Sequence, residues 1–337
     1  MKTYAEAGVD RELRKEAKKQ LVNLKSTFSL SKHGKIIETP FNTLYPINND
    51  VFHVKTSDGV GTKVLLAQLA GKHDTIGIDA IAMVVNDCIR CGAQPIALTD
   101  AIDIKKSEPE IIDEIQKGLN IGAHEAECPL VGGETADVPE LMNAFYHINC
   151  DCVGEVEKNK IITGEKIKPG DVIIGLPSSG VHSNGISLLR KTLFKAWGGK
   201  YDTFEKLDNF DRELIYEALE PTKIYVKPFL NAVKEIDILG AVHITGDAYL
   251  KFRKLTNFGF EFDNFKPQPI FNLIRDCGIS TEEMFKTFNM GCGFATIVRK
   301  EYVENALQVL KGSEVIGKII DKKIIIKFEG KKIVLED

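Results

Sequence analysis

The sequence has no surplus of positive charge: its 44 lysines and arginines are outnumbered by 48 aspartates and glutamates, for a formal net charge of -4. Without surplus cations a chain cannot neutralise the phosphates of a nucleic acid, which excludes that class of partner. No apolar run approaches the roughly 20 residues that cross a bilayer, and the segment from Met1 to Gln20 is too charged for a secretory signal. We therefore expect a cytoplasmic protein with a small-molecule partner and no membrane partner.

Cysteine is also sparse, with seven residues scattered over a chain of 337. An odd number in a long chain argues against a disulfide framework. Two pairs, Cys88 with Cys91 and Cys150 with Cys152, have short spacings that could contribute to a zinc site, but they lie in apolar runs with no matching histidines. We interpret the cysteines as reduced core thiols, with zinc as the less favoured alternative.

The chain does contain enough apolar residues for about two ordinary domains, since 43% of its residues are hydrophobic and 27% are charged. Strand-like and helix-like segments alternate in both halves. A Pro-Gly pair within Lys166 to Gly170 precedes an apolar strand, Asp171 to Leu176, and indicates a boundary near residue 165. We predict domains at residues 1–165 and 166–337.

One stretch, Ser57 to Lys63, follows a predicted strand at Val51 to Thr56 and precedes a predicted helix at Val64 to Ala70. A strand that leads through two glycines into a helix presents unpaired backbone N–H groups and a positive dipole end, which suit phosphate. Asp58 could then hold magnesium and Lys63 could contact phosphate oxygens. The alternative is a plain glycine turn with a solvated lysine.

Further acidic residues lie near other turns. In a predicted helix from Ala80 to Cys91, preceded by Asp79, the residues Asp79 and Asn86 share a face. Asp87 adjoins them and needs a cationic partner, a metal or N–H donors, because a buried unpaired carboxylate is costly. The alternative makes Asp87 a helix cap or a salt-bridge partner of Arg90.

Two histidines in the second half also follow strand-like runs. His182 lies in a loop of glycines and hydroxyls, Pro177 to Gly185, that could bind an anion or merely cap a helix. His243 ends a strand before Thr245 and Gly246, where a structural role is the alternative to catalysis. We also predict a charged helix from Arg11 to Lys25.

The chain ends are less informative. We predict a loop at Ser26 to Asn49 that could cover a site or merely connect elements. From Val315 to Leu335 we predict short strands at a solvated sheet edge.

Taken together, the sequence resembles the aminoimidazole ribonucleotide synthetases, also called phosphoribosylformylglycinamidine cyclo-ligases, of purine biosynthesis. Eight ordered motifs make a chance match improbable, although each alone is weak. They are Tyr-x-x-Ala-Gly-Val-Asp from Tyr4, Asp-Gly-Val-Gly-Thr-Lys from Asp58, Asp-x-x-x-x-Gly-Ala-x-Pro from Asp87, Gly-Gly-Glu-Thr-Ala from Gly132, Ser-Ser-Gly-x-His-Ser-Asn-Gly from Ser178, Pro-Thr-Lys-Ile-Tyr from Pro221, His-Ile-Thr-Gly from His243 and Phe-Asn-x-Gly-x-Gly from Phe288.

The resemblance implies a two-domain α+β subunit, with an N-terminal α/β domain whose sheet joins that of a second subunit into a barrel and a C-terminal domain with a mixed sheet. It implies a homodimer that uses ATP and Mg²⁺ to close a ring. ATP would phosphorylate an amide oxygen of formylglycinamidine ribonucleotide, and an internal amine would then attack that carbon and expel phosphate.

The site residues expected on this basis fall into four groups. For nucleotide binding they are Asp58, Gly59, Gly61, Thr62, Lys63, Asp79 and Asn86. For metal binding they are Asp58, Asp87 and Glu134. For substrate binding they are Ser179, Gly180, His182, Ser183, Asn184 and Thr245. For catalysis they are His243, His182 and Lys63.

The chain departs from the family pattern at three places. The segment from Phe28 to Gly34 has one glycine where the family often has several, and Asp137-Val138-Pro139 alters the stretch after Gly-Gly-Glu-Thr-Ala. After Gly246, Asp247-Ala248-Tyr249 replaces further glycines and adds charge and bulk. These changes bear on substrate recognition more than on nucleotide binding.

Rival functions belong to the same ATP-binding superfamily. Selenophosphate synthetases have a cysteine or selenocysteine near the N-terminus, whereas the first cysteine here is Cys88. Hydrogenase-maturation dehydratases end in a reactive cysteine, whereas the last here is Cys292. Thiamine monophosphate kinases lack the start at Tyr4 and the His182 motif in this form. A non-catalytic nucleotide-binding dimer is a further alternative.

Overall fold

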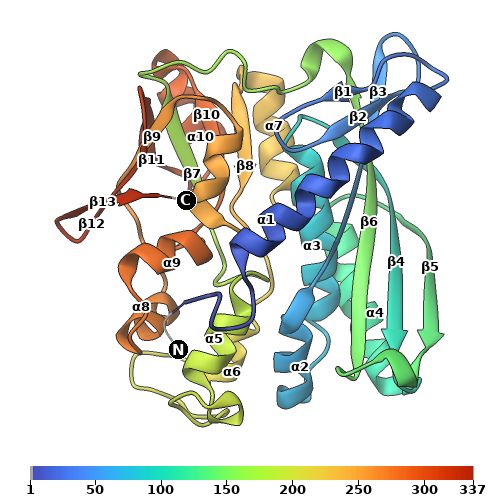
Figure 1. Cartoon of the computed structure of the whole chain (residues 1–337), viewed down its shortest axis with the longest axis vertical. Coiled ribbons are helices and arrows are strands. Elements are labelled where there is room, and N and C mark those ends of the chain that lie inside the picture. Colours follow the sequence, from blue (N-terminus) through green and yellow to red (C-terminus); the bar gives the residue numbers. More distant parts are fainter. Residues whose placement is uncertain (1–2, 337) are drawn as a thin grey trace.

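The structure is a computed structural model that describes residues 3–336, and it contains two sheet-based domains side by side (Figure 1). The N-terminal sheet has six strands in the order β1-β2-β3-β6-β4-β5, and the C-terminal sheet has seven in the order β13-β12-β9-β11-β7-β10-β8. The predicted two-domain α+β architecture is confirmed. The sheets are joined by residues 158–171, the segment that contains the proposed boundary at residue 165.

The N-terminal half packs its helices against one face of a sheet whose middle strands alternate buried and partly exposed side chains. Helix α3 lies on β3, β4 and β6 and crosses α4, and Gly77 and Gly118 allow the two backbones to approach there. The elements are α1 (Arg11–Lys19), η1 (Gln20–Leu30), β1 (Ile37–Glu38), β2 (Thr43–Pro46), β3 (Val51–Gly59), η2 (Gly61–Lys63), α2 (Val64–Ala70), α3 (Ile76–Ile89), β4 (Gln94–Ile104), α4 (Pro109–Glu125), β5 (Leu130–Asp137), η3 (Pro139–Leu141), β6 (Tyr146–Glu157) and η4 (Lys158–Lys160).

The C-terminal half builds a mixed sheet, in which β12 runs parallel to β9 and the other pairs are antiparallel. Every residue of β10 is buried, because this strand lies between β7 and β8. The elements are β7 (Val172–Pro177), α5 (Ile186–Leu193), η5 (Lys195–Trp197), α6 (Leu214–Ala218), α7 (Val226–Glu235), β8 (Gly240–His243), η6 (Ala248–Lys254), β9 (Gly259–Phe262), α8 (Pro269–Asp276), α9 (Thr281–Thr287), β10 (Cys292–Val298), η7 (Lys300–Tyr302), α10 (Val303–Val309), β11 (Glu314–Ile320), β12 (Ile324–Phe328) and β13 (Lys331–Leu335).

Two predictions about irregular or edge segments were wrong. Residues 26–49 are not simply a loop, since they hold the end of η1 and the strands β1 and β2. Residues 315–335 are not simply edge structure, because β11 lies inside the sheet between β9 and β7, with Ile316 and Ile319 buried. Only β13 of this region is an edge strand. The lysine-rich turns suggested an exposed edge, although one of the strands between them belongs to the core.

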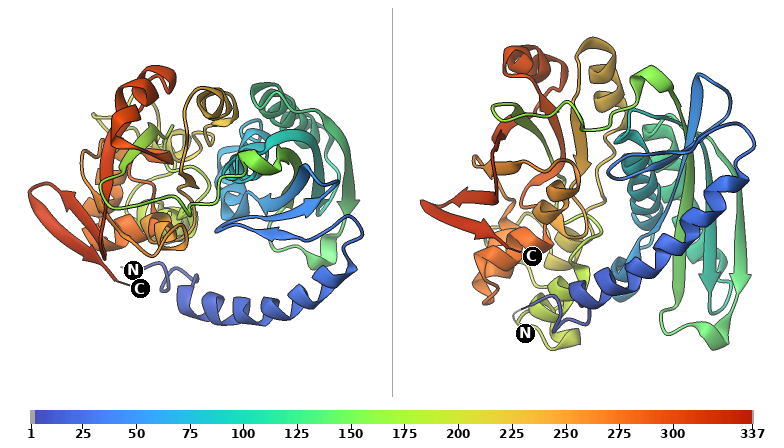
Figure 2. Two further views of the ribbon diagram at one scale, coloured as in Figure 1. Left: turned by 90° about the horizontal axis from the view of Figure 1, so that it is seen from above. Right: turned by 45° about the horizontal axis from the view of Figure 1, so that its top comes forward.

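The N-terminal segment crosses from one domain to the other as a long helical arm, α1 followed by η1 (Figure 2). The predicted helix from Arg11 to Lys25 is therefore confirmed in position, although its second part is a 3-10 helix. At the C-terminal domain, Arg11 pairs with Glu283 at 3.1 Å and Arg14 with Asp247 at 2.7 Å. Within residues 3–336 we find no helix with the length and apolarity that a membrane crossing requires.

Candidate active site between the domains

A hydrogen bond between two predicted site residues joins the two domains. Asp87, near the end of α3, accepts a hydrogen bond from Nδ1 of His243, the last residue of β8, over 2.9 Å. The other carboxylate oxygen of Asp87 pairs with Arg90 at 3.0 Å, which confirms the salt-bridge alternative. Although burial acts in the opposite direction, the Arg90 guanidinium and the hydrogen bond from His243 hold the pKa of Asp87 well below its usual range.

His243 is fully buried, and this burial lowers its pKa despite the attraction of Asp87. The ring is therefore neutral near pH 7. Because a carboxylate can only accept, Nδ1 carries the proton that is donated to Asp87, which leaves Nε2 as an acceptor. Nε2 has no hydrogen-bond partner among the described residues. The histidine thus offers one unused proton-accepting nitrogen, in an orientation fixed by the carboxylate.

Asp87, Arg90 and His243 form a charged cluster, and Asp58 belongs to it as well. It lies near the end of β3, is exposed, and accepts a hydrogen bond from the Gly59 N–H at 2.8 Å. Loss of hydration and the Asp87 carboxylate raise its pKa, while the Gly59 N–H, Lys251 and Arg90 act in the opposite direction. The cluster therefore contains two carboxylates of the N-terminal domain within electrostatic reach of each other.

Lys63 is not the solvated lysine that the plain-turn alternative describes. Its side chain is completely buried, and its ammonium group lies 2.9 Å and 2.8 Å from the two carboxylate oxygens of Asp79 and 2.7 Å from the Glu220 carbonyl oxygen. Burial lowers the pKa of Lys63, against the attraction of Asp79. The same carboxylate accepts hydrogen bonds from the Thr222 N–H (2.7 Å) and hydroxyl (2.6 Å) and from Ser183 (3.0 Å).

Asn86 also connects the domains. Its side-chain amide donates to the Lys223 carbonyl at 2.9 Å and accepts from the Tyr225 N–H at 2.8 Å. Both polar atoms of Asn86 thus hold the segment that enters α7. Asp79 holds the same segment slightly earlier in the chain, at Thr222. Their contacts therefore give Lys63, Asp79 and Asn86 a role in domain docking, which differs from the predicted nucleotide contact.

The loop around His182 is also packed inside the protein. His182 is fully buried at a φ of +59°, and its Nε2 accepts from the N–H groups of Ser179 (3.3 Å) and Lys223 (3.5 Å). Burial lowers its pKa well below the ordinary value, so the ring is neutral. Gly293 packs directly against this ring, where a larger residue would collide. These contacts describe a histidine that shapes the loop.

The remaining predicted substrate residues, and Thr62 of the predicted nucleotide set, make contacts of different kinds. Thr245 accepts a hydrogen bond from Lys251, and Asn184 has a buried Nδ2 with no partner among residues 3–336. Gly180 accepts from Asn289 through its carbonyl oxygen at 2.8 Å. Thr62, in η2 just before α2, contacts the Ser187 hydroxyl at 3.1 Å. Among these residues, Asn184 is the one whose buried donor is left unused within residues 3–336.

Glu134 does not join Asp58 and Asp87 within one chain. In the sheet register Glu134 lies opposite Ala101 of β4, which pairs with Asn149 of β6, which pairs with Gly59 of β3. The two ends of this row, Glu134 and Gly59, are three strand spacings apart, or roughly 14 Å. Glu134 is exposed on the edge strand β5 and lines a separate hollow of about 400 Å³. The predicted three-carboxylate set is therefore incorrect for a single subunit.

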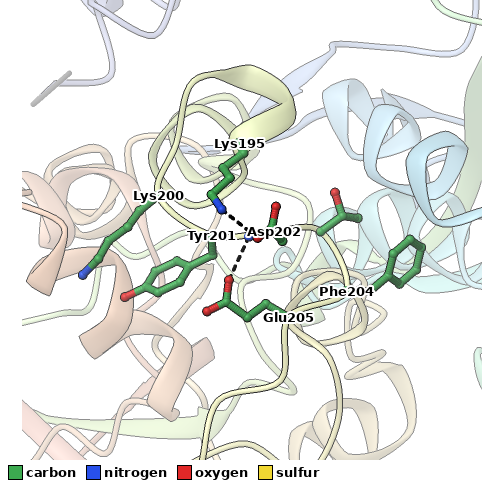
Figure 3. A pocket seen from close by; sticks show the side chains of 7 residues that line it. Lys195, Lys200, Tyr201, Asp202, Phe204 and Glu205 are labelled. Carbon is green, nitrogen blue, oxygen red and sulfur yellow. Dashed lines mark hydrogen bonds and ion pairs between the residues drawn. The ribbon is translucent and has the colours of Figure 1, made fainter.

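The cysteines are not covalently joined to one another in the described residues. All seven cysteines are free, and no group of three or more His, Cys, Asp or Glu side chains in residues 3–336 is arranged for a metal ion. The wide hollow of about 840 Å³ in Figure 3 lies elsewhere, between Lys195 and Glu205. Two of its charged side chains pair directly, since Lys195 lies 2.6 Å from Asp202, and the Asp202 N–H donates to Glu205 at 2.9 Å.

Sequence reasoning missed two cations of the cluster. Lys251, in η6, donates to the His243 carbonyl at 3.1 Å and to Thr245, and burial lowers its pKa to about 8. Arg90 was considered only as an alternative partner of Asp87. The spacing of Arg90 three residues after Asp87 on a helix was an available signal. For Lys251 the available signal was weaker, a lysine eight residues beyond a strand-ending histidine.

Comparison with known proteins adds the following. Residues 42–156 match the family model for the N-terminal domain of AIR synthase related protein, and residues 168–328 match that for its C-terminal domain. The phosphoribosylformylglycinamidine cyclo-ligase of Pyrococcus furiosus is 46% identical over 315 residues, with 92% of each chain covered. The Pyrococcus horikoshii protein of the same name is 43% identical over 342 residues, with 99% of this chain and 100% of that one covered.

A solved structure gives a comparison of the fold. The hydrogenase maturation protein HypE in complex with ATP superimposes with a TM-score of 0.62, covering 92% of this chain and 89% of that one at 16% sequence identity. At that identity the match concerns the fold alone. The two-domain arrangement found here is thus shared with a protein crystallised with ATP.

Proposed function

Because the chain belongs to the family of AIR synthase related proteins, we propose that the cluster between its domains carries out the cyclo-ligase reaction. The protein closes the ring of formylglycinamidine ribonucleotide in purine biosynthesis, with ATP as the second substrate. The observation that carries this conclusion is the full-length correspondence, at 43% and 46% identity, to relatives that bear the cyclo-ligase name. The Asp87–His243 contact shows where two of the shared motifs meet.

The chemistry requires phosphate activation followed by ring closure. The amide oxygen of the substrate takes the terminal phosphoryl group of ATP, and the bond to ADP breaks. An internal nitrogen then attacks the activated carbon, and phosphate leaves with the former amide oxygen. The attacking nitrogen must lose a proton, and the unused Nε2 of His243 is suited to accept it because the ring is neutral. Asp87 would stabilise the resulting charged ring through Nδ1.

Magnesium fits the two carboxylates of the cluster. Mg²⁺ prefers oxygen ligands and is commonly bound by one or two carboxylates together with phosphates and water. Asp58 is exposed at a strand end, and Asp87 keeps its charge because its pKa is depressed. We propose these two residues as its ligands. When bound there, magnesium supplies positive charge to the phosphate oxygens of ATP.

We assign Glu134 to the active site of a second subunit in a homodimer. The edge strand β5 leaves backbone groups unpaired, and Val131 on this strand is 64% exposed. Joining this edge to another copy would cover it and extend the sheets toward a barrel. Glu134 would then approach the Asp58 of the partner chain. We also propose a cytoplasmic location, as the sequence leads us to expect.

The activity is tested by supplying the purified chain with formylglycinamidine ribonucleotide, ATP and magnesium, and measuring ADP and the aminoimidazole product together. Thiamine monophosphate and selenide serve as alternative acceptors. Turnover of either, with none of formylglycinamidine ribonucleotide, would contradict the proposed reaction. ATP binding without ADP release on any acceptor would favour a nucleotide-sensing role.

The shared site is tested by mixing two inactive variants, Asp58→Asn and Glu134→Gln. If each site draws these residues from different subunits, random reassociation restores about a quarter of wild-type activity, since half of the dimers are mixed and each has one intact site. If both residues serve the same subunit's site, the mixture stays inactive. Sedimentation of each variant alone checks that both still assemble.

A further inference from the structure

Lys251 is a cation of the cluster that the proposed function has not used, and unlike Arg90 it has no carboxylate partner in the described chain. It lies in η6, eight residues after His243 and six after Thr245, and it is half-buried. Its ammonium group donates to the His243 carbonyl oxygen and to the Thr245 hydroxyl oxygen, both of which are neutral acceptors. Its position relative to the end of β8 is therefore fixed by two hydrogen bonds.

The charge of Lys251 is not neutralised by a direct partner. Arg90 pairs with Asp87 and Arg14 with Asp247, whereas no described carboxylate forms an ion pair with Lys251. Its charge nevertheless acts on Asp58, Asp87 and His243, which puts these groups within electrostatic reach of one another. A partly desolvated ammonium with only neutral partners favours an anionic ligand.

One other unused donor lies near Thr245. Asn184 has a buried Nδ2 without a partner in the described part of the chain. Its Oδ1 lies 3.5 Å from where a Cβ at Gly246 would stand, and the Arg14 guanidinium lies 4.0 Å from the same point. Polar groups therefore border the loop that follows Thr245. The metal-binding carboxylates of the proposed function lie on the opposite domain.

From this arrangement we propose that Lys251 is a catalytic residue, whose ammonium group binds the oxygens of the phosphoryl group as it passes from ATP to the amide oxygen of the substrate. The inference rests on the proposed function and names a residue for its first step. The phosphorus–oxygen bond to ADP breaks while the bond to the amide oxygen forms, and Lys251 exchanges no proton.

The physical reason is the distribution of charge during transfer. Negative charge spreads over the three equatorial oxygens of the moving phosphoryl group, and catalysis depends on fixed positive charge at those oxygens. Asp58 and Asp87 carry negative charge and would act on the phosphate oxygens only through magnesium. Lys251 supplies a cation directly, from the C-terminal domain. Its hydrogen bond to the His243 carbonyl also fixes its distance from the proton-accepting ring.

The first test compares Lys251→Met and Lys251→Arg with Lys254→Met, a matched change of an exposed lysine in the same 3-10 helix. With formylglycinamidine ribonucleotide and ATP, we expect Lys251→Met to lower kcat by about 10²–10³-fold. The KM for ATP should change only a few-fold, and arginine should restore part of the rate. Lys254→Met should stay within about threefold of wild type. A kcat for Lys251→Met within about threefold of wild type would overturn the proposal.

The second test needs no turnover and separates this proposal from the cyclo-ligase assignment. Calorimetry measures the binding of ADP with magnesium, alone and with aluminium fluoride, which imitates the phosphoryl group in transfer. We expect fluoride to tighten ADP binding at least tenfold in wild type and hardly at all in Lys251→Met, with binding of ADP alone unchanged. Retention of the full gain in Lys251→Met would refute the role of Lys251. Wild type without cyclo-ligase turnover would instead refute the proposed reaction.

Folding of the variants is checked by thermal melting. If Lys251→Met melts far below wild type, the comparison is made with Lys251→Gln, which keeps a donor for Thr245 but lacks the charge. The tightening of ADP binding by aluminium fluoride should again be lost. A gain retained in Lys251→Gln would contradict the proposal in the same way.

Discussion

The buried Lys63–Asp79 pair makes a specific prediction about how the two domains are held together. Both side chains have no exposed surface, and Asp79 accepts hydrogen bonds from Thr222 and Ser183 of the other domain. Changing Asp79 to leucine leaves the Lys63 ammonium buried without a counter-charge. The Glu220 carbonyl is then its remaining partner among the contacts described.

The size of the effect follows from the cost of stranding a buried charge. Removing one member of a buried ion pair costs about 3–5 kcal/mol. At about 2–4 °C per kcal/mol for a domain of this size, the melting temperature should fall by roughly 6–20 °C. The double variant Asp79→Leu with Lys63→Met removes both charges, so it should be more stable than Asp79→Leu alone.

The assay is urea unfolding of wild type, both single variants and the double variant, followed by circular dichroism at one pH. The test is whether the stability losses of the two single variants add up in the double variant, because non-additivity is expected only for groups in contact. A double variant less stable than Asp79→Leu would refute the stranded-charge explanation. So would a loss of less than about 1 kcal/mol in Asp79→Leu, a size typical of exposed pairs.

Three further perturbations test other parts of the structure. Asp87→Asn should raise the magnesium concentration for half-maximal ADP release at least tenfold, and an unchanged magnesium titration would remove Asp87 from the ligands. Burial lowers the pKa of His182 and His243, so their contribution to stability is present above pH ~6.5 and is lost as the pH falls toward their folded-state pKa values. The urea concentration at the unfolding midpoint should therefore decline from pH 7.5 to pH 5. A midpoint that does not change with pH would contradict this. Arg14→Met removes the ion pair with Asp247 and should speed limited proteolysis before residue 31 at least severalfold, with a stability loss below about 1 kcal/mol; unchanged cleavage would mean that other contacts hold the arm.

The sequence predicted the elements around the site well, because their signals are local. The helix expected at Val64 to Ala70 is α2, and the strand expected before Asp58 is β3. The pairing of Asp87 with Arg90 was foreseen as an alternative, since three residues along a helix bring side chains together. Motif order also indicated that His243 and Asp87 belong to one function, although it gave no distance between them.

What sequence could not supply was the relation between distant segments. Lys63 follows a glycine turn typical of phosphate binding, yet its ammonium group is taken up by Asp79 in the closed domain interface. The family resemblance grouped Glu134 with Asp58 as a metal ligand, and each lies next to a glycine-marked turn, but the row that connects them in the sheet is three strand spacings long. Lys251 escaped notice because its role depends on burial beside His243, which no local pattern encodes.

The burial of the cysteines has a practical consequence for spectroscopy. All seven lie within residues 3–336, and six are buried while Cys277 is intermediate. Burial raises the pKa of Cys91 to about 11 and that of Cys292 to about 12, which keeps these thiols protonated and slow to alkylate near neutral pH. A Cys277→Ser chain would thus be a quiet background for maleimide dyes at introduced cysteines. Dyes at the exposed positions Glu16 and Glu304 would report by energy transfer on movement of the helical arm relative to the C-terminal sheet.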